Sequence, residues 1–179
     1  YILRSTVWPG YASSLMESLD INRVVSNPEF LSEATAEKDS KNPPFVLLGG
    51  ANSSFLQEVK GLYEGRIKGA SVILTDNTTA ELAKLALNGF FSTKVVYCNQ
   101  IYDEAQKLKA NYETIKEVFT RHPFGFKNHT TIYYKGGRGV RGSCLPKDAK
   151  ALAHYTGAEL IKKVVELNKN YINLKETDE

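Results

Sequence analysis

The chain of 179 residues has little cysteine and no long hydrophobic run. Its two cysteines, Cys98 and Cys144, are too few for a disulfide framework and are typical of a reducing compartment such as the cytoplasm. No apolar stretch reaches the roughly 18 residues that a membrane-spanning helix needs. The three histidines are dispersed, and neither metal-site nor P-loop spacing occurs. We therefore expect no membrane partner and no bound metal.

The chain also lacks a strong charge of one sign. Its 23 Lys and Arg residues exceed the 20 Asp and Glu residues by only three, and the excess is scattered, so we expect no nucleic-acid partner. With 42% hydrophobic and 24% charged residues, the sequence can bury a core. It opens on the apolar run Tyr1-Ile2-Leu3 without Met or a leading loop, so we expect it to begin partway through a domain.

The first 74 residues alternate between strand-like and helix-like segments. Short apolar runs predict strands at residues 1–7, 22–27 and 45–48. Amphipathic patterns predict helices over 11–20, 29–38 and 53–64, the last with Phe55, Val59 and Leu62 on one face. This alternation indicates one edge of an open α/β sheet. We expect 1–7 and 22–27 to be edge strands without neighbours.

Residues 75–179 follow a mostly helical pattern that contains one long helix. Thr78 to Glu81 has the form of a capping box, and apolar residues at helical spacing continue without proline to about Leu108. This predicts a helix of roughly thirty residues, or about 45 Å. Gly89 lies inside this helix. It either allows a close approach of another segment or is simply tolerated there. Further helices are predicted over 111–121, 146–156 and 158–173, with Gly157 between the last two.

The long helix needs a partner surface, since isolated helices gain stability from packing more than from propensity. We expect a two-fold homodimer contact along it. A charge placed at Phe91 or Val95 would test this contact.

The stretch from Gly136 to Asp148, which begins within a glycine-rich, basic loop over 127–142, is the richest in possible chemistry. Its glycines would let backbone amides approach a ligand, and Arg138 and Arg141 suit a phosphate. Pro146 would open a helix and place Cys144 just before its N-terminus, where the helix dipole and Lys147 favour a reactive thiolate. The alternative for Cys144 is a small buried hydrophobic residue. Cys98, within the apolar stripe of the long helix, is predicted to lie in the core.

Polar pairs four residues apart would each share one helix face: Glu29 with Glu33, Lys84 with Asn88, and Cys144 with Asp148. Lys84 and Asn88 lie beside the apolar stripe and could stabilise an oxyanion. A solvated helix face is the alternative. The two glutamates could be acids that complement a helix dipole in a first turn.

Four segments together resemble the UDP-glucose and GDP-mannose dehydrogenase family of nucleotide-sugar 6-dehydrogenases. They are Arg4-Ser5-Thr6-Val7-Trp8-Pro9-Gly10, Ser26-Asn27-Pro28-Glu29-Phe30-Leu31-Ser32-Glu33, Thr79-Ala80-Glu81 through Lys84 to Asn88, and Gly142-Ser143-Cys144-Leu145-Pro146-Lys147-Asp148. The resemblance covers about residues 6 to 165. It implies an α+β, mostly helical fold. Residues 1–74 would be the C-terminal part of a Rossmann-like NAD-binding domain, and 75–179 a helical central domain that dimerises through its long helix.

The resemblance implies NAD as cofactor and a four-electron oxidation of a sugar C6 alcohol to the uronate. Cys144 would form a thiohemiacetal and then a thioester. UDP-glucose is slightly favoured over GDP-mannose. No Gly-x-Gly-x-x-Gly follows a strand, so we expect the chain alone to bind NAD poorly or not at all, and a separate N-terminal NAD-binding segment is one candidate partner.

The resemblance also assigns roles to individual residues. The catalytic set is Cys144, Lys84, Asn88, Asp148, Thr6 and Glu33. The substrate-binding set is Glu29, Phe30, Leu31, Lys84 and Gly142, to which we add Arg138 and Arg141 because their charge suits a phosphate. The cofactor-binding set is Thr6, Glu33, Cys144 and Lys147.

One position departs from the family pattern. Arg141 replaces the first of two glycines that usually precede Ser143. It could add a phosphate contact or, if that glycine needs a positive φ, impair substrate binding. The alternative function is a non-catalytic dimerising module derived from the family. The presence of Lys84, Asn88, Cys144 and Asp148 together favours the enzyme.

Overall fold

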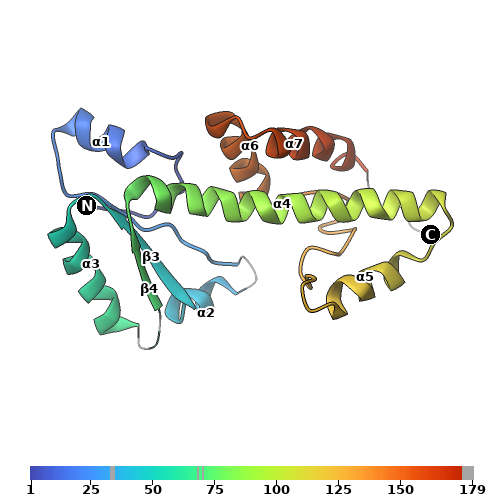
Figure 1. Ribbon diagram of the computed structural model, residues 1–179, viewed down its shortest axis with the longest axis horizontal. Helices are drawn as coiled ribbons and strands as arrows, with labels where there is room; N and C mark the ends of the chain where they lie inside the picture. The colour runs from blue at the N-terminus through green and yellow to red at the C-terminus, as the bar shows by residue number, and fades with distance from the viewer. Residues whose placement is uncertain (33–34, 68, 70, 175–179) are drawn as a thin grey trace. The chain divides into compact units, whose positions relative to one another are not determined.

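The computed structural model describes residues 1–32, 35–67, 69 and 71–174 (Figure 1). The chain divides into two compact units, Tyr1–Leu85 and Ala86–Glu179, and the boundary falls within one long helix. The predicted α+β, mostly helical fold class is confirmed.

The first unit is built on a four-stranded sheet. Its strands are β1 (Ile2–Leu3), β2 (Val25–Ser26), β3 (Phe45–Gly50) and β4 (Ser71–Thr75), in the order β1-β2-β3-β4. β1 pairs with β2 and β3 with β4 in parallel, whereas β2 and β3 are antiparallel. The helices that precede the long one are α1 (Tyr11–Leu19), α2 (Ala36–Lys41) and α3 (Ser53–Arg66).

The core of this unit lies between α3 and the sheet. It consists of buried aliphatic side chains, namely Val25, Val46, Leu48, Leu56 and Val59. Burying one such side chain is worth about 1.5–3 kcal/mol, so this cluster holds α3 on the sheet. Of the predicted α3 face, Val59 is buried and Phe55 packs against the core, but Leu62 is exposed.

Two strand predictions for this unit are wrong. Only residues 2–3 of the predicted strand 1–7 are extended in the sheet. Neither segment lacks a neighbour, because β1 pairs with β2, and β2 lies between β1 and β3.

The helix predicted over 29–38 begins only at Ala36. Residues 29–32 are irregular instead, and Glu29 Oε2 accepts a hydrogen bond from the Leu31 N–H at 2.7 Å. Such side-chain bonds to nearby backbone compete with helix formation. The expected helical pairing of Glu29 with Glu33 is therefore wrong, and Glu33 lies outside the described residues.

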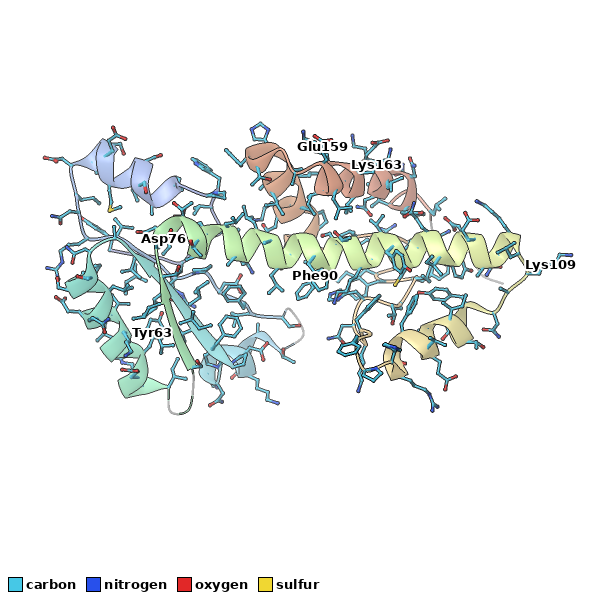
Figure 2. The ribbon with its side chains drawn as sticks, in the orientation of Figure 1. Tyr63, Asp76, Phe90, Lys109, Glu159 and Lys163 are labelled. Carbon is cyan, nitrogen blue, oxygen red and sulfur yellow. The ribbon has the colours of Figure 1, made fainter. Side chains whose placement is uncertain are left out.

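The long helix is confirmed as α4 (Asn77–Lys107), with 31 residues. Its start differs from the predicted capping box. Asp76, at the beginning of α4 in Figure 2, accepts hydrogen bonds from the backbone N–H of Thr79 at 2.8 Å and its hydroxyl at 2.6 Å. Asp76 is therefore the cap, and Glu81 is left for another role.

The second unit adds α5 (Tyr112–Arg121), α6 (Cys144–Thr156) and α7 (Glu159–Tyr171) to α4. One core cluster contains Val96, Val140, Val164 and Tyr171. A second contains Cys98, Ala105, Tyr112 and Ile132, which confirms the buried position of Cys98. No helix among the described residues is both long and apolar enough to cross a membrane.

Two glycines in this unit have the positions that the sequence suggests. A Cβ on Gly89 would lie 2.7 Å from Leu152 Cδ2, so a close approach of α6 explains this glycine. Gly157 ends α6 with a φ of +71°, a backbone conformation that glycine adopts without a steric penalty.

Candidate functional site

In the first unit, the candidate residues gather where the chain leaves β1 and β2. These strands are parallel, so the loops that follow them, 4–10 and 27–31, leave from the same edge of the sheet. Thr6 lies in the first loop, and Glu29, Phe30 and Leu31 lie in the second. A cavity of about 80 Å³ lies beside the second loop and includes Arg4 in its lining.

Lys84 of α4 is the cation of this first group. Its side chain is almost fully buried, and Nζ lies 3.5 Å from Glu29 Oε1 and 5.5 Å from the centre of the Phe30 ring. A buried ammonium needs such partners, because removing it from water is costly. The pairing turns the positive charge of Lys84 toward the 27–31 loop.

Asn27 fixes the base of that loop. Its side-chain amide donates to the carbonyl of Leu47 at 3.0 Å, and its side-chain oxygen accepts a hydrogen bond from the Tyr63 hydroxyl. The side chain of Tyr63 extends from α3 (Figure 2). The loop that carries Glu29 is thereby bonded to both β3 and α3.

In the second unit, Cys144 is exposed and is the first residue of α6. The prediction that Pro146 opens this helix is wrong by two residues, although Pro146 still lies in the first turn, where no backbone bond is lost. First-turn N–H groups have no acceptor within the helix, and the positive end of the helix attracts negative charge. The thiol therefore lies at a favourable place for charge that develops during attack.

Asp148 lies one helical turn beyond Cys144 and is almost fully buried. Its Oδ2 accepts a hydrogen bond from Asn88 Nδ2 at 2.6 Å, and its Oδ1 accepts one from Lys147 Nζ at 2.5 Å. The carboxylate thus fixes the side-chain amide of Asn88 on α4 and also forms an ion pair with the partly exposed Lys147. The predicted i,i+4 relation of Cys144 and Asp148 on one helix is confirmed.

The two arginines of the glycine-rich loop are occupied by their own chain. Arg138 is buried and donates to Asn99 Oδ1 at 3.0 Å and to Asp103 Oδ1 at 2.6 Å. Arg141 donates to the carbonyl oxygens of Arg138 at 3.0 Å and Ile172 at 2.6 Å. These bonds leave the predicted phosphate contacts without support.

Two glycines of the loop make room for protein and not for a ligand. A Cβ on Gly137 would lie 2.0 Å from Arg141 Nη2, and one on Gly139 would lie 2.6 Å from Asn168 Oδ1. Gly142 differs, with a φ of +85° and no atom within 4 Å of its Cβ position apart from those of its chain neighbours. Arg141 has no positive φ, so it meets no backbone strain in place of the usual glycine.

The sequence interpretation missed Glu81, whose carboxylate is almost fully buried in the first unit. It accepts hydrogen bonds from the backbone N–H groups of Gly10 and Ala12 and from the Ser26 hydroxyl. Its place in an apparent capping box concealed this role. Among the described residues, no group of three or more His, Cys, Asp or Glu residues could hold a metal ion.

Comparison with known families agrees with the fold of both units. Residues 78–170 match the central domain of the UDP-glucose/GDP-mannose dehydrogenase family, and residues 1–67 match its NAD binding domain. The chain belongs to this family, which confirms the resemblance seen in the sequence. The NAD binding domain identifies NAD as the cofactor.

Individual relatives give the same result. The chain is 32% identical to a UDP-glucose 6-dehydrogenase of Rickettsia felis over 179 residues, covering 94% of this chain and 39% of that protein. It is 30% identical to a GDP-mannose 6-dehydrogenase of Pseudomonas syringae pv. syringae, covering 88% of this chain and 37% of that protein. The chain thus spans about two fifths of the length of the relatives that it matches.

A solved structure supports the fold. The UDP-glucose dehydrogenase of the hyperthermophilic archaeon Pyrobaculum islandicum superposes with a TM-score of 0.81 at 25% identity. The match covers 94% of this chain and 40% of that one.

Proposed function

We propose that this chain serves the NAD-dependent oxidation of a nucleotide sugar at C6 to the uronate, with UDP-glucose as the favoured substrate. The observation that carries the proposal is the exposed Cys144 in the first turn of α6, one turn from a buried Asp148 that holds Asn88. The names of the relatives support the same chemistry.

The sheet edge of the first unit fits a dinucleotide. Ligands of open α/β sheets bind beyond the carboxyl ends of the strands, and the loops after the parallel β1 and β2 leave from that end. Gly10 in the first loop has a φ of +92° and an unfilled Cβ position, so there is space beside it for a ligand, while its own N–H is bonded to Glu81. When bound, NAD supplies the hydride acceptor for each of the two oxidation steps. We assign Thr6, Glu33, Cys144 and Lys147 to its surroundings.

In the first oxidation, the C6 alcohol loses a proton and a hydride and becomes an aldehyde. We assign Lys84 to stabilising the negative oxygen from which that proton leaves. Preorganised donors of this kind lower the barrier because they are already oriented toward the developing charge. The ion pair with Glu29 holds the Lys84 ammonium in place before the reaction.

The aldehyde then becomes covalently attached to the protein. The sulfur of Cys144 forms a bond to C6, and the thiol proton is transferred to the aldehyde oxygen, which gives a thiohemiacetal. Loss of the hydroxyl proton and of a second hydride leaves a thioester. A covalent intermediate keeps the half-oxidised sugar bound between the two steps. Asn88, held by Asp148, would donate to the tetrahedral oxyanion.

Hydrolysis completes the reaction. A water oxygen bonds to the thioester carbon, the carbon–sulfur bond breaks, the Cys144 thiol is regenerated and the uronate is released. Across the whole reaction the sugar gains one oxygen from water and loses four electrons as two hydrides. We assign Thr6 and Glu33 to holding or activating that water, with help from Asp148.

For substrate binding we propose Glu29, Phe30, Leu31 and Lys84 in the first unit and the open backbone at Gly142 in the second. Arg138 and Arg141, which the sequence suggested as phosphate ligands, we assign instead to holding the loop against α4 and the segment after α7.

The test is Cys144→Ser in the intact enzyme, assayed with NAD and either UDP-glucose or GDP-mannose. We expect uronate formation to stop and slow aldehyde formation to remain, because a serine hydroxyl is a poor nucleophile at neutral pH. Cys98→Ala is the matched control, since that thiol is buried and should be dispensable for the reaction. Full uronate production by Cys144→Ser would remove Cys144 from the mechanism.

A further inference from the structure

Glu81 is a buried carboxylate that the proposed chemistry does not use. Only 3% of the residue is exposed, yet no cation among the described residues forms an ion pair with it. Three donors satisfy it instead: the Gly10 N–H at 2.7 Å, the Ala12 N–H at 3.0 Å and the Ser26 hydroxyl at 2.9 Å. Removing a carboxylate from water is costly, and these three hydrogen bonds compensate for that cost.

The first two donors belong to the start of α1. This helix begins after Gly10, and no side chain of its own segment caps it. Glu81 supplies the missing cap from α4, at a distance of about seventy residues in the sequence. A negative charge at a helix N-terminus is favourable because it satisfies free N–H groups and complements the helix dipole.

The third donor links the same carboxylate to the end of β2. Ser26 is followed directly by the loop that contains Glu29, and its Oγ also accepts a hydrogen bond from Asn77 Nδ2 at 3.1 Å. Asn77 in turn donates to the carbonyls of Val24 at 3.2 Å and Gly49 at 2.9 Å. Glu81 therefore lies at the junction of the loop that carries Thr6 and the loop that carries Glu29.

We infer that Glu81 is a positioning residue that fixes the Thr6 loop relative to the Glu29 loop by bonding both to α4, one turn before Lys84. The inference rests on the proposed function for the roles of Thr6 and Glu29. Its structural content, a hydrogen-bonded connection of the two loops, stands apart from any activity. Glu81 acts through these loops and is not assigned a contact with substrate or cofactor.

Amide hydrogen exchange tests the connection directly. In Glu81→Gln, which keeps the shape of the side chain but replaces one acceptor oxygen by NH₂, exchange at Gly10 and Ala12 should become about tenfold faster, as expected when a helix cap is lost. Amides of α3 should keep their exchange rates. Glu64→Gln is the matched control, because it removes an exposed carboxylate of the same unit. Unchanged exchange at Gly10 and Ala12 in Glu81→Gln would overturn the inference. If that variant does not fold, Glu81→Asp retracts the carboxylate while keeping its charge and gives the same readout.

Kinetics separate positioning from general destabilisation. In the intact enzyme, Glu81→Gln should lower kcat about tenfold and change KM less than twofold. The double variant Thr6→Ala/Glu81→Gln should be no slower than Thr6→Ala alone, since residues that act through one another are not additive. Multiplied losses in the double variant would refute positioning through Thr6. If uronate formation is absent from the wild type, the proposed function fails, whereas the exchange measurement still decides the connection.

Discussion

At the scale of single residues, the polar side chains that matter are buried and bonded. Lys84, Asn88 and Asp148 are each at most 6% exposed, and each has a named partner. Burial strengthens electrostatic interactions and makes the loss of one partner costly. Cys144 differs because it is exposed, as a nucleophile must be reachable.

For Lys84→Ala we predict a fall in kcat of roughly 10²–10³ with a much smaller rise in KM, because its charge acts on an oxygen that becomes negative only during reaction. Steady-state kinetics of the intact enzyme measure both constants. Lys60→Ala, which removes a lysine from an exposed ion pair of α3, is the control and should be neutral. An effect confined to KM would make Lys84 a ground-state binding residue.

His129 predicts a pH dependence of stability. Burial, followed by the positive charge of Lys94, lowers the pKa of His129 below its ordinary value of about 6.5. The unfolded chain therefore binds the proton more readily. The contribution of the neutral His129 imidazole to stability is therefore complete above about pH 6.5 and declines as the pH falls below that value.

Urea midpoints at pH 7.5 and 5.5 check this prediction. The wild type should lose more stability on acidification than His129→Asn, which cannot titrate and tolerates the φ of +72° at this position. Equal losses in the two proteins would contradict the role of His129.

At the scale of elements, packing decides where glycine is required. Gly61 lies within α3 with open space around its Cβ position, whereas a Cβ added to Gly89 in α4 would lie 2.7 Å from Leu152 Cδ2. The two helices thus contain the same residue type for different reasons. One glycine is dispensable, and the other allows α6 to approach α4.

We predict that Gly61→Ala raises the free energy of unfolding by about 0.5–1 kcal/mol, because alanine restricts the unfolded chain and favours helix. Gly89→Ala should lower it, because overpacking a core costs about 1–3 kcal/mol and outweighs the same gain in propensity. Chemical denaturation of both variants gives the comparison. A matching gain at Gly89 would show that Leu152 moves aside freely.

At the scale of the whole molecule, α4 leaves aromatic surface uncovered. Phe90, whose side chain projects from α4 in Figure 2, is 56% exposed, and Tyr97 is 46% exposed. By contrast, Phe91 stacks on His129 with 4.6 Å between the ring centres, and Val95 packs against the core cluster that contains Val96. The two-fold contact along this helix stays a prediction, and Phe90 and Tyr97 are better positions to test it than Phe91 and Val95.

We predict that Phe90→Glu or Tyr97→Glu converts a dimer into a monomer, because an unpaired charge buried in an interface is costly. Light scattering at tens of micromolar measures the mass. Leu19→Glu, at an exposed position at the end of α1, is the control and should remain dimeric. A wild type that is already monomeric, or dimers in both α4 variants, would place the contact elsewhere.

The sequence by itself determined the features that depend on local spacing. Apolar residues at helical intervals were enough to predict α4, and the burial of Cys98 followed from its place in that stripe. The end of α6 at Gly157 and the i,i+4 relation of Cys144 to Asp148 are equally local. In each case, a helix fixes the geometry of residues only a few positions apart.

Only the tertiary structure decided which distant groups the polar side chains would meet. The arginines of the glycine-rich loop suggested phosphate, yet Arg138 bonds to Asp103 of α4. Glu81 fitted a capping box, yet it caps α1. A side chain that can accept or donate a hydrogen bond pairs with whichever partner the folded chain brings within about 3 Å. Once the pair is buried, water cannot replace that partner. Sequence spacing carries no information about such partners.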